Sequence, residues 1–149
     1  MVGRYEQFAS AISCIYRDIQ KIERIEMAKY GLKGPHAQCL LALHDNPEGI
    51  TAAKLCEACE KDKAAVSRIL AELEHTGMVL RESFNGSRYR ANLFLTEQGK
   101  KAAKAVVAKA QLAVERAGIG FDDAQREVFY SVLSMIAGNL HSLCRDGLS

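Results

Sequence analysis

Apolar side chains recur every three or four residues along the first thirty positions of the chain. The stripe consists of Phe8, Ile12, Ile15, Ile19 and Ile22. This spacing is typical of one face of an amphipathic helix, which we predict from about residue 4 to about residue 30. At 1.5 Å per residue such a helix is roughly 38 Å long, which is longer than a small core can cover. We therefore expect its stripe to pack against a second partner.

Turn and capping residues divide the rest of the chain into five further helices. The expected helices run from about Pro35 to Leu43, Ala52 to Cys59, Lys63 to His75, Thr96 to Gly118, and Phe121 to Leu143. Thr51, Asp62 and Thr96 are residue types that cap helix N-termini, and Thr76-Gly77 is a helix stop. The sequence therefore predicts a mainly α-helical fold.

A β-hairpin is expected after the helix that ends at His75. The Asn85-Gly86 pair is a strong hairpin signal, and it joins two predicted strands, Met78 to Phe84 and Tyr89 to Leu95. Two helices joined by a short turn form a helix-turn-helix, and a hairpin directly after the second helix makes the motif winged. This order of elements predicts a winged helix-turn-helix, about six helices plus one β-hairpin wing.

The helix from Lys63 to His75 carries a candidate DNA-reading surface. Its buried face is expected to hold Val66, Ile69, Leu70 and Leu73, and its exposed N-terminal surface Lys63, Ala64, Ala65, Ser67 and Arg68. Small alanines permit close approach to thymine methyl groups in a major groove about 12 Å wide, and Ser67 and Arg68 can bind base edges or phosphate. In a competing interpretation, Arg68 only pairs with Glu72 one turn away.

Two arginines lie at the predicted hairpin tip, residues 85–90. Arg88 and Arg90 project to the same side if the strand begins by Arg88, because side chains alternate along a strand. Two guanidinium groups on a narrow ribbon can reach an adjacent minor groove or the phosphate backbone. The alternative is that they only solubilise an exposed hairpin.

Several segments share the order and spacing of one known motif. They are Leu55-Cys56-Glu57-Ala58-Cys59, Val66-Ser67-Arg68, Leu73-Glu74, Gly77-Met78-Val79, Arg81, Arg88 and Leu95-Thr96-Glu97-Gln98-Gly99. Together they resemble the winged-helix signature of the MarR family of bacterial transcriptional regulators. The long first helix, residues 38–41 and the two closing helices extend this resemblance to nearly the whole chain. One departure lies at the wing, where Ser87 replaces the usual acidic residue and Tyr89 the next basic one, so the family's wing contact carries over only at Arg88.

The resemblance implies an intertwined homodimer. A single MarR-like domain over residues 1–149 would comprise a helical dimerisation region, 1–34 and 97–149, and a winged helix-turn-helix region, 35–96. Two such motifs would bind a pseudo-palindromic operator, so the implied function is a sequence-specific DNA-binding transcriptional regulator, a ligand-responsive repressor. The expected DNA-binding residues are Thr51, Lys54, Lys63, Ala64, Ala65, Ser67, Arg68, Arg81, Asn85, Arg88 and Arg90.

The resemblance also implies a ligand cleft beside the first, second and fifth helices. The effector-binding candidates are Tyr16, Tyr30, His36, Cys39 and His44. Cys14 is the candidate redox residue, because some relatives sense oxidants through a cysteine near the start of the first helix. Cys56 and Cys59 have CxxC spacing, but no second ligand pair completes a metal site, so we expect them to pack as small hydrophobes, as we do Cys39 and Cys144. No metal and no cofactor are expected.

Composition and charge narrow the function classes. The 149 residues are 48% hydrophobic and 26% charged, which is typical of one ordinary globular domain. The longest apolar run is about five residues, so no membrane span is expected, and the N-terminus lacks a signal-peptide pattern. Five cysteines, an odd number, favour reduced thiols, and we expect a cytoplasmic protein.

The basic excess coincides with the predicted motif, because residues 51–104 hold ten basic and seven acidic side chains. No catalytic constellation of nucleophile, base and acid is evident, so we do not expect an enzyme. Two alternatives remain beside the ligand-responsive repressor, a thiol-based redox-sensing regulator that uses Cys14 and a winged-helix protein-interaction module without DNA binding. The expected partners are double-stranded DNA, a second copy of the chain and a small-molecule effector, with no membrane.

Overall fold

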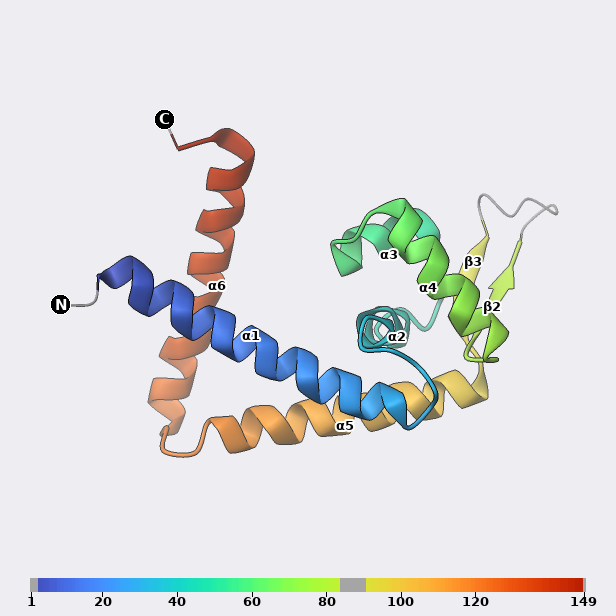
Figure 1. Cartoon of the computed structure of the whole chain (residues 1–149), viewed down its shortest axis with the longest axis horizontal. Coiled ribbons are helices and arrows are strands. Elements are labelled where there is room, and N and C mark those ends of the chain that lie inside the picture. The colour runs from blue at the N-terminus through green and yellow to red at the C-terminus, as the bar shows by residue number, and fades with distance from the viewer. Residues whose placement is uncertain (1–2, 84–90, 149) are drawn as a thin grey trace. The chain divides into compact units, whose positions relative to one another are not determined.

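The computed structural model describes residues 3–83 and 91–148 (Figure 1). The helices are α1 (Arg4–Ala28), α2 (His36–His44), α3 (Ala52–Cys59), α4 (Lys63–His75), α5 (Glu97–Ala117) and α6 (Asp123–Asp146), and the strands are β1 (Ile50–Thr51), β2 (Val79–Glu82) and β3 (Asn92–Leu95). The chain divides into two compact units, Met1–Gln111 and Leu112–Ser149, with the boundary inside α5. The predicted mainly α-helical winged helix-turn-helix fold is confirmed.

The three strands form one antiparallel sheet in the order β1-β3-β2. In the predicted hairpin, β2 pairs with β3 in a register that sets Val79 opposite Leu95. The strand β1 was not predicted from the sequence, because two residues are too short to show an alternating pattern. It pairs with β3 through Ile50 and Leu93, and Thr51 then caps α3, so β1 anchors the helix-turn-helix to the wing.

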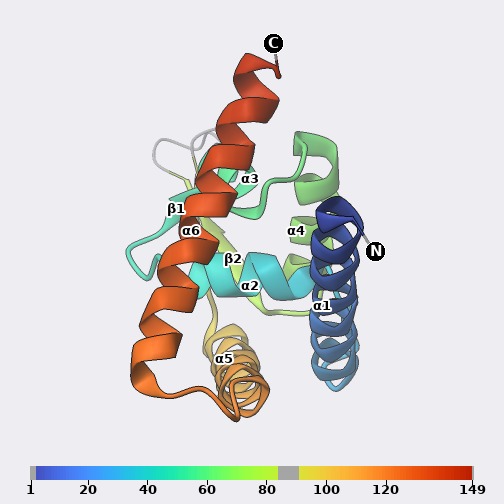
Figure 2. The ribbon, with the colours of Figure 1, turned by 90° about the vertical axis from the view of Figure 1, so that its left-hand side faces the viewer.

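The core of the first unit forms around α2, which contacts α1, α3, α4 and β3. Figure 1 views α2 end-on and Figure 2 lengthwise, and in both it lies between the α3–α4 pair and the first part of α5. Leu40 and Leu43 from α2 are buried with Leu55 of α3 and Leu70 and Leu73 of α4. The helix-turn-helix is therefore supported from behind by a continuous apolar core.

Glycine ends α4 and turns the chain into the wing. Gly77 has a φ of +75°, and the amides of Gly77 and Met78 donate to the Glu74 and Leu73 carbonyls at 3.1 and 2.9 Å. This is a Schellman motif, which requires a left-handed residue just past the helix end. The predicted Thr76-Gly77 stop is thus confirmed.

The first turn of α5 is fastened to this same segment. The Thr96 amide donates to the Met78 carbonyl at 3.0 Å, and the Thr96 hydroxyl donates to the Gly77 carbonyl at 2.5 Å. The Gly99 amide in turn donates to the Thr96 hydroxyl at 3.1 Å, which confirms Thr96 as an N-cap. A side chain on Gly99 would meet the Met78 backbone, with its Cβ 2.0 Å from the carbonyl oxygen. The end of α4 and the start of α5 are therefore held in contact by backbone groups.

The second unit consists of the end of α5 and the helix α6. Asp122 caps α6 through a capping box, because its carboxylate accepts from the Gln125 amide at 2.7 Å and the Gln125 side chain accepts from the Asp122 amide at 3.0 Å. The rings of Phe121 and Phe129 lie 5.8 Å apart. No described residue of α6 is buried. Cys144, expected to pack, is exposed instead, because this short unit has no core in which a thiol could be buried.

Both long terminal helices carry uncovered apolar side chains. Those of α1 are Phe8, Ile12, Ile15, Ile19, Ile22 and Ile25, and those of α6 include Val128, Phe129, Val132, Leu133, Leu140 and Leu143. Each of these side chains is more than one-third exposed in the single chain. The predicted stripe of α1 is thus confirmed as a face that the first unit leaves uncovered.

Candidate nucleic-acid interface

The turn between α3 and α4 is built by local backbone chemistry. Glu60 adopts a left-handed conformation with a φ of +51°, and the Lys61 amide donates to the Cys56 carbonyl at 3.2 Å. Asp62 then caps α4, because its carboxylate accepts from the Ala65 amide at 2.7 Å. At the other end of the motif, the Thr51 hydroxyl caps α3 by accepting from the Lys54 amide at 3.3 Å. Both predicted N-caps are confirmed, and together they fix where each helix starts.

The helix α4 has the two predicted faces. Val66, Ile69, Leu70 and Leu73 are buried, and Lys63, Ala64, Ser67 and Arg68 are exposed, with Ala65 half-buried between the two groups. Residues four apart lie on one side of a helix, so the exposed set forms a single surface over the first two turns. This surface offers two basic groups, a hydroxyl and a methyl group, the side-chain types that read a major groove.

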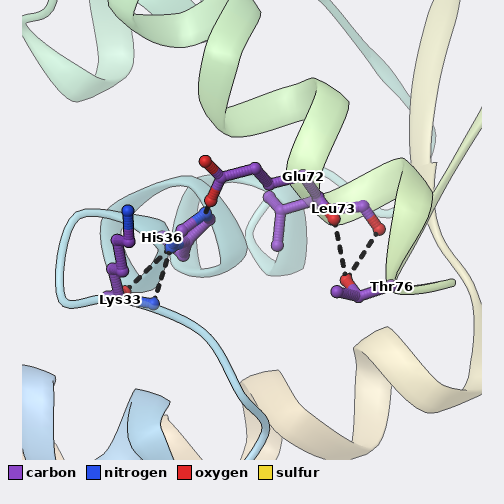
Figure 3. Close-up of polar contacts among 5 residues, drawn as sticks. All are labelled: Lys33, His36, Glu72, Leu73 and Thr76. Atoms are coloured by element: carbon purple, nitrogen blue, oxygen red, sulfur yellow. Dashed lines mark hydrogen bonds and ion pairs between the residues drawn. The ribbon is translucent and has the colours of Figure 1, made fainter.

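A buried histidine lies beside Glu72, the partner considered for Arg68. His36 lies at the start of α2, and its Nε2 atom is 2.7 Å from a carboxylate oxygen of Glu72 on α4 (Figure 3). Its Nδ1 atom lies 2.9 Å from the Lys33 amide nitrogen and 3.0 Å from the Lys33 carbonyl oxygen. The Glu72 side chain is half-exposed, and one of its carboxylate oxygens lies against His36. Within residues 3–83 and 91–148, Arg68 forms no ion pair, so its guanidinium is available to a ligand.

The contact to Glu72 is close but imperfectly aligned. The distance is that of an ion pair, yet Nε2 of the buried His36 lacks a well-directed hydrogen bond. A carboxylate oxygen 2.7 Å from a buried ring nitrogen satisfies much of the electrostatic need of that nitrogen. The pair connects α2 to α4 and helps to fix the orientation of α4.

The remaining predicted DNA-binding residues have different surroundings. Lys54 is exposed on α3, and Thr51 is half-buried. Arg81 of β2 is half-buried and pairs with Glu74 of α4, with its Nη2 and Nε atoms 2.6 and 3.2 Å from one carboxylate oxygen. Arg81 thus connects the base of the wing to α4. The predicted wing contacts Asn85, Arg88 and Arg90 lie outside the described residues.

The predicted effector residues do not form one site. His36 and Cys39 are buried in the core, and Tyr30 and His44 are half-buried. Of the five, only Tyr16 lines a cleft in the first unit. This cleft, about 850 Å³, lies among α1, the loop before α2 and the turn between α3 and α4. Its basic residues, which the sequence did not reveal as a group, are Arg17, Lys21, Arg24, Lys33 and Lys61.

The cleft also contains an acidic side chain with a perturbed pKa. Burial raises the pKa of Glu23, and the nearby Lys61 ammonium group partly offsets that rise. Lys61 belongs to the turn between α3 and α4, so the charge balance of the cleft includes a residue of the helix-turn-helix.

The cysteines fall into two groups. Cys14 and Cys144 are exposed, whereas Cys39 and Cys59 are buried and Cys56 is half-buried against the core. The packing predicted for Cys39, Cys56 and Cys59 is thus confirmed. Among the described residues, no three His, Cys, Asp or Glu side chains are grouped to hold a metal ion. Over the same residues, no helix combines the length and apolarity that crossing a bilayer requires.

The fold and the exposed face of α4 define a winged helix-turn-helix of the DNA-binding type. Residues 30–88 match the model of the MarR family. The chain is 26% identical over 129 residues to YybA, an uncharacterized HTH-type transcriptional regulator of Bacillus subtilis (strain 168), covering 87% of this chain and 85% of that protein.

Solved structures share this fold. A MarR transcriptional regulator from Methanosarcina mazei Go1 superposes with a TM-score of 0.77 at 28% identity, over 91% of both chains. A MarR family regulator from Listeria monocytogenes, solved with a 26mer DNA, superposes with a TM-score of 0.81 at 22% identity, over 95% of both chains. The chain is thus similar to MarR family regulators, by the family model over residues 30–88 and by the fold over most of its length.

Proposed function

We propose that the chain is a sequence-specific DNA-binding transcriptional regulator that inserts the first two turns of α4 into a major groove. The observation that carries this proposal is the exposed surface of Lys63, Ala64, Ser67 and Arg68 on a helix that is fixed at both ends. Arg68 supplies a planar guanidinium for guanine or phosphate, and Ser67 supplies a hydroxyl for a neighbouring base edge. As a regulator of transcription it would act in the cytoplasm of a bacterial cell.

Residues around α4 would position the protein on the duplex. Thr51 and Lys54 flank the start of α3, where they can contact phosphates, and Ala65 can contact a thymine methyl group beside Ala64. Arg81 would orient the base of the wing through Glu74. Asn85, Arg88 and Arg90 remain the predicted wing contacts, to the minor groove or its phosphates.

A binding titration against tiled DNA tests this function. Fluorescence anisotropy is measured with duplexes that tile the region upstream of the protein's own gene, at about 150 mM salt. We expect nanomolar binding to one tile above a uniform micromolar background. Weak binding to every tile, abolished by salt, would contradict specific reading of this region and favour a winged-helix module with a protein partner.

We further propose that the protein works as a homodimer. The uncovered apolar faces of α1 and α6 support this, because long apolar stripes on a single chain require a partner surface. Residues 1–34 and 97–149 would form the dimerisation region, and residues 35–96 would form one winged motif per subunit. A two-fold protein then matches a pseudo-palindromic operator with half-sites about one helical turn apart.

Substitutions on the α1 stripe are expected to separate the subunits. Ile15 and Ile19 are 55% and 46% exposed in the single chain, so Ile15→Glu with Ile19→Glu leaves the core of the first unit intact but puts four charges into the dimer interface. Sedimentation velocity should give twice the 16.4 kDa chain mass for the wild type and a single-chain mass for the variant. Leu80→Glu in β2 makes the same change outside the proposed interface and should remain dimeric. A double variant that stays dimeric would exclude α1 from the interface.

The cleft beside α1 supports a ligand-responsive repressor. Five basic residues line a space whose volume suits a small organic molecule, so the ligand class that fits best is a small aromatic anion. Because Lys61 lies both in the cleft and in the turn before α4, a bound anion can favour one placement of α4 over another. It releases DNA only to the extent that it binds the two placements differently.

A thermal-shift screen tests the cleft. With a panel of aromatic carboxylates, we expect at least one to raise the Tm of the wild type by several degrees, because ligands that bind only the folded state stabilise it. Lys21→Glu should abolish the shift, and Lys101→Glu, an exposed lysine of α5, should preserve it. A shift that survives Lys21→Glu would place the ligand elsewhere. The Cys14 hypothesis stays a prediction, with its thiol exposed on α1.

A further inference from the structure

Two buried thiols from different helices lie in contact behind the helix-turn-helix. The Sγ atom of Cys39, in the middle of α2, is 3.5 Å from the Sγ atom of Cys59, the last residue of α3. Cys39 is 0% exposed and Cys59 is 7% exposed. Both are free thiols, and their separation exceeds a disulfide bond by only about 1.5 Å. A movement of about 1.5 Å, shared between the two side chains and the end of α3, would join them.

The two thiols have opposite electrostatic surroundings. The hydrogen bond shared with the Cys39 thiol lowers the pKa of Cys59, burial raises that pKa, and the Lys61 ammonium group lowers it. The same hydrogen bond and burial raise the pKa of Cys39. Cys59 is also the more exposed of the two thiols, so it is the member of the pair that an oxidant reaches first.

A small solvent pocket reaches Cys59. It has a volume of about 360 Å³, lies between α2 and the end of α3, and is lined by Cys59 together with Gln38, Asn46 and Ala58. Cys39 does not line this pocket. A small oxidant can thus approach Cys59 from solvent, whereas Cys39 is buried in the core.

We propose that Cys59 and Cys39 form an oxidative modification site, at which a hydroperoxide oxidises Cys59 and Cys39 then closes a disulfide between α3 and α2. In the first step the Cys59 thiolate attacks one peroxide oxygen, the O–O bond breaks, and the other oxygen leaves as an alcohol or water after taking a proton. Cys59 is now a sulfenic acid.

In the second step Cys39 completes the oxidation. Its sulfur attacks the Cys59 sulfur, the S–S bond forms, the S–O bond breaks, and water leaves with the Cys39 proton. The sum is two thiols and one hydroperoxide giving one disulfide, one alcohol or water molecule and one water molecule. The hydroperoxide is reduced by two electrons, which the two thiols supply.

The disulfide would act on the turn that positions α4. Cys59 directly precedes the turn 60–62, in which Glu60 already holds a left-handed conformation and Asp62 caps α4. Pulling the end of α3 toward α2 therefore displaces the start of α4. We expect oxidation to lower DNA affinity at least tenfold, a consequence that rests on the proposed function, whereas the chemistry at the two thiols does not.

Peptide mapping of the full-length protein tests the site. The reduced protein is treated with one equivalent of hydrogen peroxide, thiols are blocked, and the protein is digested with trypsin and with a glutamate-specific protease. Trypsin places Cys39 in residues 34–54 and both Cys56 and Cys59 in residues 55–61, and cleavage after Glu57 separates these two cysteines. We expect a cross-linked peptide that joins Cys39 to Cys59.

Variants assign the role of each thiol. The double variant Cys14→Ser with Cys144→Ser changes only exposed residues and should form the same disulfide at an unchanged rate. Cys39→Ser should stop at a sulfenic acid on Cys59 that dimedone traps, and Cys59→Ser should leave Cys39 unmodified. Circular dichroism checks that Cys39→Ser and Cys59→Ser are folded. If either is not, the exposed double variant still tests the proposal, because it should form the disulfide between Cys39 and Cys59.

Three results would overturn the proposal. They are a Cys59 that stays reduced while Cys14 or Cys144 is oxidised, a disulfide between Cys56 and Cys59, and no oxidation under one equivalent of peroxide. DNA binding, measured by fluorescence anisotropy on the same samples, tests the proposed function separately from the disulfide. A disulfide without loss of operator affinity refutes the coupling to α4, and a reduced protein that binds no DNA refutes the function but leaves the disulfide in place.

Discussion

Arg68→Glu is expected to lower affinity for the operator about 100-fold or more. Arg68 is exposed on the outer surface of α4, and Glu72, its potential partner one turn on, faces His36 in the core. Loss of one bidentate contact to guanine costs about 1–3 kcal/mol, and a carboxylate in the same place adds repulsion from phosphates. Two subunits bind one operator, so the loss occurs twice. Fluorescence anisotropy on the operator tile measures it.

Lys104→Glu is the matched control for this change. It reverses one exposed charge on α5, which lies across α2 from α3 and α4 (Figures 1 and 2). It should change affinity by less than about threefold, because screening at physiological salt limits a charge to a range of about 8 Å. Both variants should keep the wild-type Tm, since both side chains lie outside the core. Equal losses of operator affinity in the two variants would mean that Arg68 contributes only to the overall charge of the protein.

Gly99→Ala is expected to lower the free energy of unfolding by about 3 kcal/mol or more. The new Cβ would lie 2.0 Å from the Met78 carbonyl oxygen and 2.9 Å from its carbonyl carbon. Both are backbone atoms, and the Met78 carbonyl also accepts from the Thr96 amide, so the start of α5 must move away from the end of α4. Overpacking of this kind typically costs 1–3 kcal/mol even where only side chains must yield. Urea denaturation followed by circular dichroism measures the loss.

Gly138→Ala is the control for the glycine substitution. Gly138 lies within α6, and nothing comes within 4 Å of a Cβ built on it. Alanine is the better helix former by about 1 kcal/mol, so this variant should be as stable as the wild type or slightly more stable. If Gly99→Ala also left the free energy of unfolding unchanged, it would contradict the close approach of α5 to the Met78 backbone.

Local signals made the helix-turn-helix predictable from the sequence. Asp62 and Thr51 cap their helices through side-chain bonds that span three residues, and Gly77 ends α4 within one turn. Such contacts depend on neighbours in the sequence, so residue type and spacing are enough to reveal them. The same holds for the buried stripe of α4, which follows the helical period.

Long-range contacts were not predictable in the same way. His36 meets Glu72 and Cys39 meets Cys59 only because α2 packs against α4 and α3, and no local pattern encodes those pairings. The basic cleft likewise combines α1 with Lys61 from a distant turn. The strand β1 is too short for a pattern and depends on β3 for its hydrogen bonds. These features follow from tertiary packing, which a single sequence does not display.

Selection of binding sites from a randomised duplex library tests the central claim, that α4 reads DNA as part of a two-fold protein. For the wild type we predict a two-fold symmetric motif with half-sites about 10 base pairs apart. For Arg68→Ala we predict loss of preference at one position in each half-site, with the rest of the motif retained. Wild-type selection without any motif, or a motif unchanged by Arg68→Ala, would contradict the claim.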